Sequence, residues 1–108
     1  MFVQTLEGAD HWSETTAGTD SGAAATKAAE SGSQHFVTGI SGHTDADSLI
    51  TIKDGSTVIW EIKIDVSVAG LDFHCAGLVL PITPGAAASG NIAASSADCQ
   101  VAIWGITI

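Results

Sequence analysis

The stretch LITIKDGSTVIWEIKIDVSV, residues 49–68, decides the fold class of this chain. From Val58 to Val68 every second residue is apolar, and four of the five residues between them are polar. This period of two is typical of a β-strand with one buried face. The Asp54-Gly55 pair that precedes the strand is a turn signal, so the stretch predicts a β-hairpin.

The register of this hairpin follows from the need to keep apolar faces together. A two-residue loop would place Ile50 opposite Ile59, on the polar face of the second strand. A three-residue loop ending at Gly55 pairs Ile50 with Val58 instead. We therefore expect a three-residue hairpin, a type I turn with Gly55 in the left-handed region, and a core formed by the even-numbered residues 58–68.

The rest of the chain shows the same pattern of short predicted strands separated by turn signals. With 108 residues it is long enough for one domain and too short for two. Strands at such spacing predict an all-β protein, an antiparallel β-sandwich of about eight strands. The expected strands are 23–29, 35–41, 48–53, 57–68, 71–76, 78–82, 90–94 and 99–108.

The first residues differ in composition from this strand-rich part. Residues 1–22 are polar and lack a regular period, so we expect an N-terminal arm followed by a sandwich domain at residues 23–108. If the arm is ordered, Trp12 is its expected anchor in a groove of the same chain or of a neighbour.

The last strand is apolar on both faces. Val101 and Ile103 lie on one face, whereas Trp104, Ile106 and Ile108 lie on the other. In an antiparallel strand with one solvated face, apolar and polar residues alternate. This strand is therefore expected either centrally between packed layers or at a subunit interface. The candidate partner-contact residues are therefore Trp12, Trp104, Ile106 and Ile108.

The charge balance excludes several classes of partner. Twelve acidic residues face three lysines and no arginine, which gives a formal charge of -9. Such a surface repels nucleic acid and anionic membranes. The N-terminus has no export-signal pattern, and no stretch has the length of a transmembrane helix. With 45% apolar and 14% charged residues, we expect some surface to be covered by other subunits.

Motifs for chemistry are missing from the sequence. The histidines lack zinc-ligand spacing, and the Asp45–Asp47 segment begins like a calcium loop but lacks its continuation. We expect no catalytic, cofactor or metal site, and therefore no enzyme. A hydrolase with a triad of scattered residues is the weakest alternative. Pairing of Cys75 with Cys99 stays open. The four histidines are His11, His35, His43 and His74.

Several phrases of the sequence resemble small virion proteins of tailed phages. They are ATKAAESGSQHFVTGISG at 25–42, LITIKDGSTVIWEIKI at 49–64, LPITPG at 80–85, NIAAS at 91–95 and VAIWGITI at 101–108. Together they look like the jelly-roll decoration (cement) proteins of phage heads, and the match covers about four-fifths of the chain from residue 23 onward.

The resemblance implies a fold, a partner and a location. It implies a jelly-roll sandwich that forms a homotrimer, binds the major capsid protein on the outer surface of the virion and clamps capsid subunits together. Such a protein is made in the host cytoplasm and needs no cofactor. The alternative is a ligand- or carbohydrate-binding β-sandwich module of a tail or fibre, with Trp104 or Trp12 as its aromatic platform.

Overall fold

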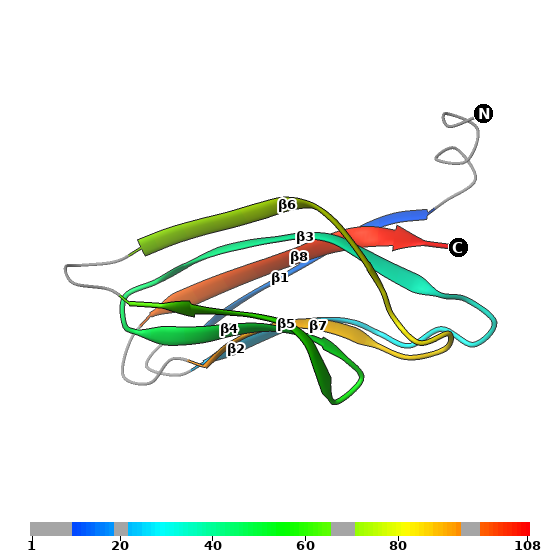
Figure 1. The fold of residues 1–108 in the computed structure, drawn as a ribbon, viewed down its shortest axis with the longest axis horizontal. Helices are drawn as coiled ribbons and strands as arrows, with labels where there is room; N and C mark the ends of the chain where they lie inside the picture. The colour runs from blue at the N-terminus through cyan, green and yellow to red at the C-terminus, as the bar shows by residue number, and fades with distance from the viewer. Residues whose placement is uncertain (1–9, 19–21, 66–70, 94–97) are drawn as a thin grey trace.

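The computed structural model describes residues 10–18, 22–65, 71–93 and 98–108, and these residues form strands and turns without a helix (Figure 1). In this part of the chain, accordingly, no helix is long and apolar enough to cross a membrane. The eight strands are β1 (Asp10–Gly18), β2 (Ala23–Lys27), β3 (His35–Thr44), β4 (Ser48–Asp54), β5 (Thr57–Ile64), β6 (Leu71–Pro81), β7 (Ala88–Ala93) and β8 (Cys99–Thr107).

The strands form two antiparallel four-stranded sheets that pack as a sandwich. Their orders are β1-β8-β3-β6 and β2-β7-β4-β5. The chain thus pairs from its ends inward, β1 with β8, β2 with β7, β3 with β6 and β4 with β5, as one long hairpin folded over itself. This connectivity is that of a jelly roll, so the expected fold class is confirmed.

The inner faces of both sheets supply the core. Along β8, residues 99, 101, 103, 105 and 107 are buried, whereas the residues between them are partly or fully exposed. Buried residues of β3 and β4 add branched aliphatic side chains to this core between the sheets, where their burial drives folding. The largest buried aliphatic side chains are Ile40, Ile50, Ile52, Ile82, Ile103, Val37 and Val101.

The central hairpin has a different turn from the expected one. Asp54 pairs with Thr57, so the loop has two residues, and Gly55 adopts a φ of 60°, in the left-handed region as expected. A register shift after Ile52 then pairs Ile52 with Trp60. The expected three-residue loop is wrong because a β-bulge supplies the extra residue that brings the apolar faces together.

The strand β5 is also more exposed than its sequence suggests. Ile64 is buried and Trp60 packs partly against the core, but Val58 and Ile62 are exposed. The reason is that β5 is the last strand of its sheet, with β4 on one side only. The expected positions 66–68 of this strand lie outside the described residues.

The expected boundary at residue 22 does not match the sheet. Residues 10–18 of the predicted arm form β1, which pairs with β8 along its whole length. Trp12 lies opposite Gly105 and packs partly against the core of its own chain. The polar composition of β1 reflects its position as an edge strand, since an edge strand needs few buried side chains. Residues 1–9 lie outside the described residues.

Two further strand predictions meet in the first sheet. The expected strands 71–76 and 78–82 are one strand, β6, which is interrupted where Gly77 has a φ of 76°. Pro81 ends this edge strand, as expected. The doubly apolar last strand, β8, lies in the interior of its sheet between β1 and β3.

Candidate functional site

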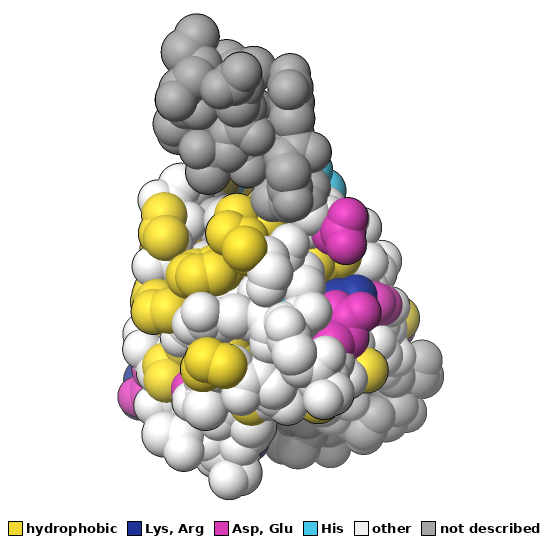
Figure 2. All heavy atoms as spheres, turned by 90° about the vertical axis from the view of Figure 1, so that its right-hand side faces the viewer, with side chains coloured by type: hydrophobic (Ala, Val, Ile, Leu, Met, Phe, Trp, Pro, Cys, Tyr) yellow, Lys and Arg dark blue, Asp and Glu magenta, His cyan; other side chains and the backbone are white. Residues whose placement is uncertain are grey.

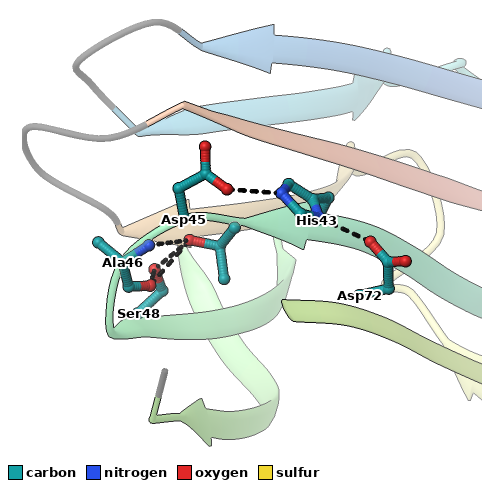
Figure 3. A network of polar contacts seen from close by, with 6 residues as sticks. His43, Asp45, Ala46, Ser48 and Asp72 are labelled. Atoms are coloured by element: carbon teal, nitrogen blue, oxygen red, sulfur yellow. Dashed lines mark hydrogen bonds and ion pairs between the residues drawn. The ribbon is translucent and has the colours of Figure 1, made fainter. Parts of the chain in front are cut away.

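A histidine held between two aspartates forms a polar cluster on the described surface (Figure 3). His43 is near the end of β3, Asp72 is near the start of β6, and Asp45 follows β3 in the turn. The ring Nδ1 of His43 is 2.6 Å from Oδ1 of Asp72, and its Nε2 is 2.7 Å from Oδ1 of Asp45. We call this group the His43 clamp; it ties β3, β6 and the β3–β4 turn together.

The clamp favours the doubly protonated form of the ring. A carboxylate only accepts hydrogen bonds, so each ring nitrogen must donate one, and the imidazole carries both protons. In accord with this geometry, the hydrogen bonds that His43 donates to Asp72 and then to Asp45 raise the pKa of His43 above its ordinary value of 6.5. Neither nitrogen is left to take a proton from a nucleophile while the clamp is closed.

The clamp is expected to give the protein a pH-dependent contribution to stability. Because the folded-state pKa of His43 is raised, this contribution is fully present below about pH 6.5 and is lost as the pH rises through the raised value. Asp72→Asn should lower the pKa of His43 more than Asp45→Asn, since the bond to Asp72 has the larger effect. An NMR titration of the His43 ring measures both shifts. An unchanged pKa in the Asp72→Asn variant would contradict the clamp.

The turn beside the clamp is held by hydroxyl groups. Thr44 Oγ1 donates to the carbonyl of Ala46 at 2.9 Å and lies 2.9 Å from Oγ of Ser48, which also donates to that carbonyl. These bonds replace the backbone pairing that the chain loses as it crosses between sheets. Asp45 and Asp47 are exposed on this turn, as expected for a solvated acidic turn.

A second histidine is buried at the other end of the molecule. His35 Nε2 donates to the carbonyl of Ala28 at 2.8 Å, and its Nδ1 is 2.6 Å from Oγ1 of Thr107. The Trp12 ring packs edge-on against His35 with centroids 5.9 Å apart. Both ring nitrogens of His35 are thus used to join β3, β8 and the β2–β3 connection, a structural arrangement.

The candidate partner-contact residues occupy three different places. Trp12 lies on the inner side of β1. Trp104 and Ile106 lie half-buried on the outer face of β8, and Ile108, after the strand, is 61% exposed. The structure therefore does not bring the four residues together as one surface.

The ring of Trp104 lies across the backbone of Gly39. A Cβ added at Gly39 would collide with this ring, so the absence of a side chain there makes room for it. On the same face, the ring of His74 is 5.5 Å from that of Trp104 at an angle of 31°. Ser13 and Thr38 line the shallow hollow beside Trp104.

Cysteine and metal chemistry have little support in the described residues. Cys75 is on β6 and Cys99 is on β8, with β3 between these strands, and no disulfide joins the two thiols. Burial raises the pKa of the Cys99 thiol above its ordinary value, which makes the thiolate scarce. Across the described ranges, no group of three or more His, Cys, Asp or Glu side chains is arranged to hold a metal ion.

The chain was compared with known protein families, curated proteins and solved structures. No protein-family model and no curated protein matches the chain. Among solved structures, the chain is similar to a protein of Bacillus endospore appendages, which are described as a novel family of disulfide-linked pili. The identity is 17%, the match covers 90% of this chain and 88% of that chain, and the TM-score is 0.35. A similarity at this level shows nothing about what the present chain does.

Proposed function

We propose that this chain is a structural protein of a phage virion, a non-enzymatic decoration protein that binds the outer surface of the head as a homotrimer. The observation that carries the proposal is an exposed apolar strand on an otherwise acidic jelly roll. Three large aliphatic side chains of β5 are exposed in a chain with a formal charge of -9. Exposed apolar groups of this kind are typical of surfaces that other protein subunits cover.

The sequence segments that resemble decoration proteins support a specific partner and location for this structural role. The major capsid protein is then the partner, the capsid surface is the location, and no cofactor is required. The high negative charge suits this place, because it keeps particles apart and repels nucleic acid released from broken heads.

Binding to phage heads tests the proposal. Purified protein is added to undecorated heads and to heads that already carry their decoration protein, and bound protein is measured after sedimentation. We expect saturable binding to the undecorated heads only, together with a higher rupture temperature of the particles. Absence of saturable binding to undecorated heads would overturn the proposal.

The second candidate function is a ligand-binding module of a tail or fibre. The observation that favours it is the Trp104 ring, which lies along the outer face of its sheet beside the hydroxyls of Ser13 and Thr38. Aromatic rings flanked by hydroxyl groups suit the apolar faces and hydroxyls of sugars. Tryptophan fluorescence that changes with a glycan in the wild type, but not in a Trp104→Phe variant, would favour this function over decoration.

A further inference from the structure

The two sheets have four edge strands, and β5 is the least protected of them. β1 is polar, β2 has five residues, and β6 is interrupted at Gly77 and ends at Pro81. Short length, polar side chains, bulges and prolines are the features that keep edge strands from pairing with other chains. β5 has eight residues without proline; its bulge lies near the turn, which leaves the part from Trp60 to Ile64 regular.

The exposed side chains of β5 are unusually apolar. Val58 is 44% exposed, Ile59 is 36% exposed and Ile62 is 41% exposed. Trp60 is half-buried and packs against the core. Covering these side chains would remove apolar surface from water, which is favourable in proportion to the area covered.

This side of the molecule is also the place where two acidic copies can approach. The charged residues of β5 are Glu61 and Lys63, which cancel, and residues 73–93 of β6, β7 and their connection carry no charged side chain. Figure 2 shows hydrophobic side chains mainly on the left of that view, which is the near side of Figure 1, and acidic side chains mainly on the right. Copies that each carry a charge of -9 repel least when they meet through a neutral strand.

We infer that β5 is the contact strand between copies of this chain, an inference that deepens the proposed function and rests on it. The charge pattern is self-complementary, since the head-to-tail contact of a cyclic trimer can place Glu61 of one copy against Lys63 of the next. Ile59 and Ile62 then form the apolar centre of the contact. A charged pair at the rim adds specificity to this centre more than it adds affinity.

Light scattering after gel filtration tests the inference with a charge swap. The wild-type protein should have the mass of a trimer, three times 10.9 kDa. Lys63→Glu places like charges opposite each other and should raise the dissociation constant about tenfold. The double variant Glu61→Lys/Lys63→Glu restores opposite charges and should return the wild-type mass. Ile59→Asp, at a position that pairs with no residue of β4, should give the 10.9 kDa monomer.

Ile108→Asp is the matched control. Ile108 is more exposed than Val58, Ile59 or Ile62 but follows β8, a strand of the other sheet, so the Ile108→Asp variant should keep the wild-type mass. Circular dichroism shows which variants are folded, and the exposed Lys63 and Glu61 variants keep the test valid if Ile59→Asp does not fold. A wild-type monomer would overturn the inference, as would a folded Lys63→Glu variant with unchanged association. Head binding distinguishes the two proposals: association through β5 without binding to heads contradicts decoration alone.

Discussion

Replacing Ile103 with alanine is expected to lower the free energy of unfolding by about 3 kcal/mol. Ile103 is fully buried in β8, a strand in the interior of its sheet, and its side chain packs between the two sheets. Truncation removes apolar contacts and leaves a cavity, because paired strands on both sides cannot close around the gap. Denaturation in urea, with the midpoint and slope of the transition, measures the loss.

The matched control lies three residues away in the same strand. Ile106 points to the outer face and is half-buried, so Ile106→Ala should cost about 1 kcal/mol, in proportion to the smaller area that it buries. Both variants lose the same atoms from the same strand. Equal losses of stability in the two variants would contradict the assignment of the inner and outer faces of β8.

The second large effect is expected from Gly105→Ala. A Cβ at this position would collide with the backbone carbonyl oxygen of Phe36 and would lie 2.8 Å from the ring of Trp12. The backbone of β3 is fixed by pairs on both sides, so it cannot move aside without loss of hydrogen bonds. We expect a loss of about 3 kcal/mol in the free energy of unfolding, measured by thermal or urea denaturation.

Gly90→Ala is the control for this substitution. Its added Cβ would lie 3.1 Å from the Cδ1 atom at the end of the Ile40 side chain and 3.3 Å from Cβ of Ile103. A side-chain end can shift by a few tenths of an ångström, so the expected loss is about 1 kcal/mol. A Gly105→Ala variant as stable as Gly90→Ala would show that β1, β3 and β8 do not approach as closely as the structure places them.

Much of the fold follows from periodicity in the sequence. Alternation of apolar and polar residues predicts β5, and the Asp54-Gly55 pair predicts the turn between β4 and β5. The rule that apolar faces must meet was correct, but it has two solutions. A longer loop and a β-bulge both shift the register by one residue, and the sequence does not distinguish between them.

The position and burial of the edge strands are the features that the sequence predicts least well, for a physical reason. A central strand needs apolar side chains on its inner face, whereas an edge strand tolerates either pattern. The polar sequence of β1 predicts an arm, and the alternating sequence of β5 predicts a buried face. The neighbours of a strand in the sheet decide whether its side chains are buried. The local sequence pattern contains no information about a missing neighbour.

The His43 clamp cannot be predicted from the sequence, for a different reason. His43 and Asp45 are close in the chain and could be noted together, but Asp72 reaches them only because β6 pairs antiparallel with β3. No spacing rule connects residues that meet through such a pairing. The contact of the Trp104 ring with Gly39 and the contact of His35 with Thr107 also join residues that are distant in the sequence and meet only through strand pairing.

The sequence by itself determined the all-β class, the acidic surface and the central hairpin, because side-chain periodicity, charge and turn chemistry are local properties of the chain. The tertiary structure alone decided which strands are edges, which apolar side chains stay exposed on β5 and which polar groups meet around His43. These features depend on strand order and pairing between distant segments, and such contacts form only when the two sheets assemble around a common core.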